Sequence, residues 1–283
     1  MYRDHKNRTW NIENLKQFSL EKHSEVRQAW TFAFFKHVLS GNTEGRLSRI
    51  PKNKGKITVS LGDIASVHRG ISTGANDFFV LTDMEVEAMG LSKTDYVRMV
   101  MPTRIRKDEL PTVFGIEDWN DLKENGKRCW LLCLPSVSPD ELPSSVKEYI
   151  RKGERNGIQL IPTCRDREPW YHIKISRTPV SDLVFTYMSR GYPKFIYNKA
   201  RVYNLTNLLG IRISGPTRFS DRKMANFVEQ LNTELEKWID LEVVGRKYPG
   251  GLVKFEPGDL KNMPICEQSL VKSLGLVPLV SNS

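Results

Sequence analysis

The sequence has few cysteines and no long apolar run, and both absences exclude classes of protein. Four cysteines in 283 residues are too few for a disulfide scaffold. No segment approaches the ~20 apolar residues that a membrane-spanning helix needs. The first eight residues are polar and of mixed charge, unlike a secretory signal. We therefore expect a cytoplasmic protein with no membrane partner.

The charge of the chain is biased towards the basic side. It contains 43 Lys and Arg residues against 33 Asp and Glu residues, a formal net charge of +10. With 39% apolar and 27% charged residues, the composition is that of a folded protein. The length fits one large domain or two small ones. The positive excess indicates a polyanionic partner, first of all nucleic acid, although a basic surface also simply keeps a protein in solution.

Two stretches concentrate the positive charge. Residues 46–56, which include Lys52, Lys54 and Lys56, are rich in basic residues and contain no acid. They fit a solvated linker and a basic arm against phosphates equally well. The second stretch lies between Asp182 and Asp221, where basic, aromatic and asparagine residues occur without any acid. Such residues can neutralise phosphates, pair with base edges and stack on bases, or the aromatic residues can form a strand core.

The pattern of apolar residues predicts an α+β fold of mixed short strands, with helices gathered towards the two ends of the chain. Helical spacing occurs at 24–39 and at 221–239, where Asp221 is a candidate N-cap. Shorter helices fit 83–89 and 143–153. Strand-like runs occur at 66–70, 77–82, 96–101, 128–134, 170–175, 182–188, 193–198 and 208–213.

Three glycine-containing motifs carry basic or polar side chains. The first, RGISTGANDFF, runs from Arg69 to Phe79, and its glycines permit a tight loop with exposed backbone N–H groups. The second is YMSRG at 187–191, followed by PKFIYNKAR at 193–201. The third is RKYPGGL at 246–252, followed by KFEPGDL at 254–260. Taken alone, the first fits a simple hairpin and the third a helix-terminating turn.

In this order, the motifs resemble a known family. RGxxTGANDFFVLT, WY at 170–171, YMSR, PKFIYNKARVYN and RKYPGGLVKFEPGDLKNMP are together similar to the C-terminal specificity domain of TaqI-like, gamma-class adenine-specific DNA methyltransferases. The resemblance extends to type IIG restriction–modification enzymes and covers roughly residues 57–265. It implies a target-recognition domain that grips duplex DNA from the major-groove side and reads bases. A separate catalytic domain, which binds S-adenosylmethionine, would methylate the flipped adenine.

The sequence departs from the full enzyme in two motifs. No two prolines are adjacent, so the NPPY-type catalytic motif is absent, and no Gly-x-Gly forms a glycine-rich cofactor loop. We expect no catalysis and no cofactor in this chain, with S-adenosylmethionine bound by a separate catalytic domain or subunit. Residues 1–56 would be a helical extension and basic linker, either a remnant of the connection to that domain or a docking segment. Residues 57–283 would be the target-recognition domain.

Other chemistries are weaker alternatives. A Mg²⁺-dependent restriction endonuclease needs clustered carboxylates and a lysine, and the Asp-x-Lys pattern begins at Asp221 and at Asp259. Cys129 and Cys133 lie in an apolar run, and no close pair of histidines exists, which favours buried thiols over a zinc site. RNA binding ranks below DNA binding because the aromatic residues do not match the RNP pattern of an RRM.

The sequence therefore predicts sequence-specific binding of double-stranded DNA, as the specificity domain or subunit of an adenine methyltransferase in a restriction–modification or phage-defence system. Phosphate contacts are expected from Lys52, Lys54, Lys56, Lys194, Lys199 and Lys254. Groove or base contacts are expected from Arg69, Thr73, Asn76, Arg190, Asn198, Arg201, Arg246 and Lys247. Tyr187 and Tyr248 are expected to support these contacts or to stack.

Overall fold

The computed structural model describes most of the chain from residue 59 to residue 265. The described residues are 2–3, 9–10, 59–102, 109–175, 179–189, 193–214, 219–239, 246–248 and 252–265. The predicted helix at 24–39 and the basic stretch at 46–56 lie outside them. Within them, helices combine with antiparallel sheets, so the predicted α+β class is confirmed.

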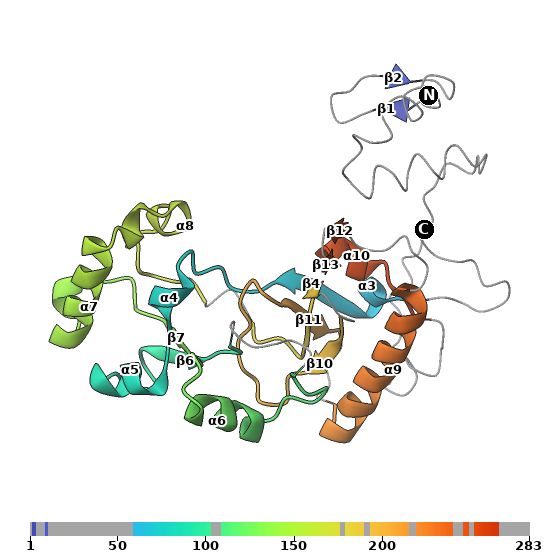
Figure 1. The fold of residues 1–283 in the computed structure, drawn as a ribbon, viewed down its shortest axis with the longest axis horizontal. Helices are drawn as coiled ribbons and strands as arrows, with labels where there is room; N and C mark the ends of the chain where they lie inside the picture. Colours follow the sequence, from blue (N-terminus) through green and yellow to red (C-terminus); the bar gives the residue numbers. More distant parts are fainter. Residues whose placement is uncertain are drawn as a thin grey trace.

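A four-stranded antiparallel sheet forms the centre of one half of the molecule (Figure 1). In the order β10-β8-β11-β4, its strands are β10 (Phe195–Tyr197), β8 (Leu183–Phe185), β11 (Leu209–Ile213) and β4 (Ala65–Arg69). The strand runs predicted at 66–70, 182–188, 193–198 and 208–213 all contribute to it. Register places Leu209 of β11 opposite Arg69, at the very end of β4.

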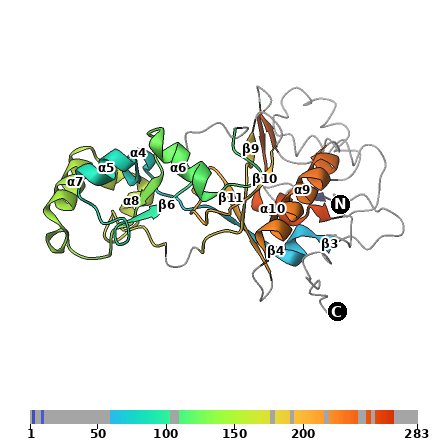
Figure 2. The same cartoon turned by 90° about the horizontal axis from the view of Figure 1, so that it is seen from below.

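The two faces of this central sheet belong to different cores, because successive residues of a strand point to opposite sides. Leu183 and Phe185 share a core with helix α9 (Asp221–Ile239), which lies across one face (Figures 1 and 2). The intervening Val184 packs into the core of the other half of the molecule. Six residues of the apolar stripe predicted for α9 are buried, namely Met224, Phe227, Val228, Leu231, Leu235 and Trp238, while nothing is described of the seventh side chain, Ile239.

The other half of the molecule, here called the helical lobe, surrounds a smaller antiparallel sheet with short helices (Figure 2). In the order β5-β7-β6, its strands are β5 (Val80–Leu81), β7 (Trp130–Leu132) and β6 (Val97–Met99). Its helices are α4 (Asn76–Phe79), α5 (Asp83–Ala88), α6 (Ile116–Glu124), α7 (Ser144–Arg155) and α8 (Pro162–Arg165). Short 3-10 turns, η1 (Pro139–Glu141) and η2 (Ile158–Leu160), connect them.

Smaller sheets join segments that are remote in the sequence. Strand β13 (Leu252–Lys254) lies between β12 (Arg246–Tyr248) and β9 (Met188–Ser189). Helix α10 (Pro257–Lys261) follows β13 and packs against β4 and α3 (Leu61–Ile64). Two-residue strands pair as β3 (Val59–Ser60) with β14 (Pro264–Ile265) and as β1 (Tyr2–Arg3) with β2 (Thr9–Trp10).

The structure corrects several local predictions. The expected strand at 77–82 is α4 followed by β5, because the carbonyl of Ala75 accepts from both Phe78 and Phe79 in a helical turn that buries both rings. No strand is assigned within 170–175, where Tyr171 and Ile173 alternate with more exposed neighbours and so imitate a strand pattern. Helices α5 to α7 lie in the middle of the chain, so the described helices are not confined to its ends.

The first turn of α9 is capped by a different residue from the one predicted. The Ser220 hydroxyl accepts a hydrogen bond from the N–H of Lys223 at 3.4 Å, the contact typical of an N-cap. Asp221 is the first residue of the helix, where its negative charge still favours the helix N-terminus. Among the described helices, none is both long enough and apolar enough to span a membrane.

The outer edge of β10 is covered by side-chain and main-chain groups. The Asn232 side chain of α9 accepts from the Phe195 N–H at 2.7 Å and donates to the Phe195 carbonyl at 3.0 Å. Two residues further along, Tyr197 exchanges main-chain hydrogen bonds with Thr112 and Phe114. The exposed backbone groups that an edge strand normally presents are therefore paired here.

Candidate nucleic-acid interface

The end of β4 and the end of β13 meet at an exposed group of charged side chains, here called the basic cluster and defined as Arg69, Lys254 and Glu256. Arg69 Nη2 donates to Glu256 Oε2 at 2.8 Å, and Lys254 Nζ lies 2.9 Å from Glu256 Oε1. The Arg69 side chain is 68% exposed, whereas those of Lys254 and Glu256 are 23% and 25% exposed. The cluster carries two positive charges and one negative charge, and Arg69 reaches furthest into solvent.

The three sequence motifs converge on this cluster. Strand β13, which carries Lys254, places that residue opposite Arg246 of β12 on one side and opposite Met188 of β9 on the other. Tyr187, just before β9, is part-buried and donates its hydroxyl to the carbonyl of Thr206 at 2.6 Å. Its own carbonyl accepts from the N–H of Phe255. Strand pairing therefore brings residues 187 and 254 together, and the Arg69–Glu256 ion pair joins residue 69 to them, although the three are remote in sequence.

Several predicted contact residues of these motifs lie outside the description of the structure. Strand β12 is described as backbone, but nothing is described of the side chains of Arg246, Lys247 and Tyr248. Arg190 follows β9 directly and lies outside the described residues. The same holds for Lys52, Lys54 and Lys56. Their assignment to DNA contacts stays a prediction.

The loop that follows Arg69 is held rigidly between two other segments. Arg167 donates from Nη1 to the Thr73 carbonyl at 2.9 Å and from Nη2 to the Ser72 carbonyl at 2.6 Å. On the other side, a Cβ at Gly70 would lie 2.2 Å from the Leu205 carbonyl oxygen, so only glycine fits there. The backbone conformation of this loop is therefore held in place by its contacts with Arg167 and Leu205.

Within this loop, the two predicted polar contacts differ in accessibility. Thr73 is 2% exposed and donates its hydroxyl to Asn76 Oδ1 at 2.6 Å. Asn76 is exposed at the start of α4. Thr73 therefore supports the loop and cannot reach a base in this conformation, while Asn76 can.

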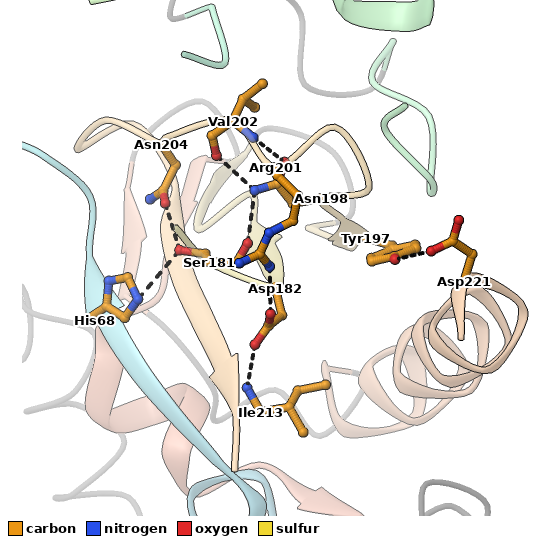
Figure 3. Close-up of polar contacts among 10 residues, drawn as sticks. All are labelled: His68, Ser181, Asp182, Tyr197, Asn198, Arg201, Val202, Asn204, Ile213 and Asp221. Carbon is orange, nitrogen blue, oxygen red and sulfur yellow. Dashed lines mark hydrogen bonds and ion pairs between the residues drawn. The ribbon is translucent and has the colours of Figure 1, made fainter. Parts of the chain in front are cut away.

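A second group of predicted residues surrounds the turn between β10 and β11 (Figure 3). Asn198 is fully buried, and its amide donates to the carbonyls of Ser181 and Val202 at 2.9 and 2.8 Å. Its Oδ1 accepts from the N–H of Val202 at 3.1 Å. These bonds close a turn in which Arg201 adopts a φ of 55°, a left-handed value that is rare for residues other than glycine. Asn198 thus shapes the turn and is not available to a base edge.

The basic side chains around this turn already have partners. Arg201 Nη1 donates to Asp182 Oδ1 at 2.7 Å, and the other oxygen of Asp182 accepts from the N–H of Ile213 at 3.0 Å (Figure 3). Lys199 lies 3.5 Å from a carboxylate oxygen of Asp221. Lys194 is part-buried, and its ammonium donates to the carbonyl of Leu110. Arg201 and Lys199 are still exposed, whereas Lys194 is the least accessible of the three.

A small polar network lies behind this turn, under the end of β4 (Figure 3). The Ser181 hydroxyl donates to Asn204 Oδ1 at 2.9 Å and lies 3.4 Å from His68 Nε2. A Cβ at Gly210, which pairs with His68 in the sheet, would lie 2.3 Å from both His68 Cε1 and Ser181 Oγ. Asn204 of the acid-free stretch and Ser181, just before that stretch, therefore support the backbone near the end of β4.

The carboxylates considered for a nuclease have structural partners. Asp221 Oδ1 accepts the Tyr197 hydroxyl at 2.8 Å, and Asp259 Oδ2 accepts the N–H of Glu256 at 3.0 Å. The described residues contain no group of three or more His, Cys, Asp or Glu side chains arranged to hold a metal ion. Burial raises the pKa of Cys129 and of Cys133 to about 12, so both thiols stay protonated, as expected for core residues.

Two functional candidates, Glu256 and Arg167, were missing from the sequence prediction. Glu256 is one of two acids, with Asp259, in the motif KFEPGDL, and no local pattern distinguishes it as a contact of Arg69. Arg167 contacts a loop 94 positions earlier in the chain, and nothing in its local pattern indicates that contact.

Comparison with known proteins places these features in a family. Residues 31–280 match the family model described as type II methyltransferase M.Eco57I, C-terminal domain. The chain is 28% identical over 207 residues to type II methyltransferase M.AccI from Acinetobacter calcoaceticus. It is 25% identical over 210 residues to type II methyltransferase M.XamI from Xanthomonas campestris pv. amaranthicola. Each alignment covers 73% of this chain but 36% of the relative, so the chain spans about a third of the length of these relatives.

Among solved structures, the type IIG restriction endonuclease BpuSI is similar at a TM-score of 0.42 and 12% identity, over 77% of this chain and 26% of that chain. A similarity of this size carries no argument by itself. The family match confirms the predicted resemblance to a C-terminal domain of DNA-methyltransferase type, without distinguishing a TaqI-like subgroup. The chain belongs to the family of the C-terminal domain of type II methyltransferase M.Eco57I.

Proposed function

We propose that this chain is a target-recognition domain that binds double-stranded DNA in a sequence-specific manner. It would serve an adenine-specific DNA methyltransferase in a restriction–modification or phage-defence system. Family membership supports the link to a type II methyltransferase. The observation that carries the proposal is the basic cluster. There, an ion pair joins Arg69 of the first motif to Glu256 of the third, and Lys254 binds the same carboxylate.

The contacts divide by chemistry and by exposure. Lys254 is a compact point charge suited to a phosphate, which contributes affinity without reading sequence. Arg69 has a planar guanidinium that can pair with O6 and N7 of a guanine, and it is the most exposed member of the basic cluster. Asn76, Lys199 and Arg201 are also exposed, and their assignment to DNA contacts stays a prediction. The proposed surface does not include Thr73 and Asn198, because their side chains are buried.

In this proposal, a separate domain or subunit carries out the methyl transfer. The sequence contains neither an NPPY-type motif nor a Gly-x-Gly loop, so the residues present do not fit S-adenosylmethionine. A separate catalytic domain or partner subunit would bind that methyl donor and act on the adenine. The role of this chain is then to bind the duplex and to fix its register relative to that partner.

The first test is selection of bound duplexes from a randomised pool by the purified chain at about 150 mM salt, where non-specific contacts weaken. A single enriched motif of several base pairs is the expected result. Binding that shows no enrichment and vanishes as the salt concentration rises would refute target recognition.

Two matched variants then locate the surface. Lys254→Ala should weaken binding to selected and random duplexes alike and reduce the slope of log affinity against log salt by about 0.9, the value for one lost phosphate contact. Lys127→Ala removes the same charge from an exposed position of the helical lobe and should leave both quantities unchanged. Equal losses in the two variants would show that the basic cluster is not the binding surface.

A further inference from the structure

The Glu256 carboxylate holds two cations at once. One oxygen accepts from Arg69 Nη2 at 2.8 Å, and the other lies 2.9 Å from Lys254 Nζ. The Arg69 side chain nevertheless keeps 68% of its surface exposed. The ion pair uses one terminal nitrogen of a guanidinium that carries five N–H donors, so other donors remain for a ligand. The carboxylate thus anchors one side of the planar guanidinium and leaves the other side for a ligand.

The position of Glu256 is fixed by rigid neighbours. It precedes α10, and its N–H donates to Asp259 Oδ2 at 3.0 Å. The preceding residue, Phe255, is fully buried in the core beneath the central sheet. Helix α10 itself packs against β4, the strand that ends at Arg69. The backbones of both partners therefore belong to the same packed unit, which keeps the two side chains within reach of each other before any ligand arrives.

Glu256 is the N-cap residue of α10 and pairs with the part-buried Lys254, but neither of these roles accounts for its contact with Arg69. An ion pair with one partner this exposed contributes little to folding, because water and salt screen it. An acid in the middle of a surface that meets a polyanion also lowers affinity for phosphates. What the acid does supply is orientation, since a guanidinium held on one side has fewer conformations to lose when it pairs with a base.

We infer that Glu256 is a specificity-determining residue of the interface: it orients the Arg69 guanidinium toward one base edge and opposes the capture of a phosphate at that position. This inference rests on the proposed function. Its substrate class is a duplex with a guanine at the position that Arg69 reads, because guanine presents the O6 and N7 acceptors that match the free side of a guanidinium. Glu256 acts as a positioning residue in this scheme.

The test is Glu256→Gln, which keeps the shape of the side chain and removes its charge. Affinity for random duplexes should rise about fivefold at about 150 mM salt, and the salt slope should steepen by about 0.9, as for one added phosphate contact. Preference for the selected sequence over a variant with that guanine replaced should fall about tenfold. Glu124→Gln makes the same change of charge at an exposed position of α6 and should alter none of these quantities.

A second variant separates orientation from folding. Arg69→Lys keeps the charge but loses the planar fork, so preference at the guanine should fall about tenfold while random binding and the salt slope stay unchanged. Circular dichroism and melting temperature establish that each variant folds. If Glu256→Gln melts like the parent chain and discriminates equally well, the inference is refuted while the proposed function stands. If Glu256→Gln does not fold, unchanged discrimination in Arg69→Lys refutes the inference. A parent chain that selects no sequence overturns both.

Discussion

The hydrogen bonds from Arg167 to the loop after β4 predict that loss of this side chain lowers the free energy of unfolding. Arg167→Ala removes two hydrogen bonds from a charged donor, to the carbonyls of Ser72 and Thr73. It also removes a guanidinium that lies 5.6 Å from the ring centroid of Phe79. The Ser72 contact is exposed and the Thr73 contact part-buried, so together the two bonds are worth about 2 kcal/mol. The ring contact adds about 0.5–1 kcal/mol.

The expected loss of unfolding free energy is therefore about 2.5–3 kcal/mol, or a fall of about 5–12 °C in melting temperature for a chain of this size. Urea titration and thermal melting, both followed by circular dichroism, measure it. The matched control is Arg165→Ala, which removes the same side chain from an exposed position, 66% exposed, in the adjoining helix α8. That control should change stability by at most about 0.5 kcal/mol. If the two variants melt within about 1 °C of each other, Arg167 does not hold the loop.

Two further predictions concern ionisation. Burial raises the pKa of Tyr149 to about 12, above its ordinary value of 10.0, so its contribution to stability is complete below pH 10 and is lost as pH rises towards 12. Urea titrations at pH 9, 10 and 11 should show a smaller alkaline loss in Tyr149→Phe than in the parent chain, and parallel losses would contradict this account. Because burial raises the pKa of Cys129 and Cys133 to about 12, neither thiol should react with iodoacetamide at pH 8 until urea unfolds the chain. Mass spectrometry of native samples that finds either residue alkylated would contradict their burial.

Much of the fold could be predicted because it depends on local periodicity. The stripe of α9 repeats at helical spacing, and the strands of the central sheet alternate in burial or form short apolar runs. The strand predicted at 77–82 was wrong because the residue types there are typical of a strand while the backbone forms a helical turn. Phe78 and Phe79 form a buried pair on a helical turn, although adjacent aromatic residues are typical of strands.

The candidate site could be predicted only in part, because its members are chosen by long-range packing. The basic motifs identified Arg69, Tyr187 and Lys254, and strand pairing together with the Arg69–Glu256 ion pair brings these residues together. The same chemical reasoning also selected Asn198, whose amide instead closes a buried turn. Side-chain type indicates what a residue can bind, but exposure decides whether it does, and exposure depends on contacts that are distant in sequence. Several aromatic residues of the acid-free stretch, such as Phe195, prove to be core residues.

The covered edge of β10 has a consequence for self-association. The Asn232 amide occupies the place where the backbone of an additional strand would bond to Phe195, and the segment at 112–114 does the same at Tyr197. The central sheet therefore ends at β10 and offers no template there for a strand from another copy of the chain. Replacing Asn232 with an apolar residue would expose the N–H and carbonyl of Phe195, so this amide shields that part of the edge from a strand of another copy.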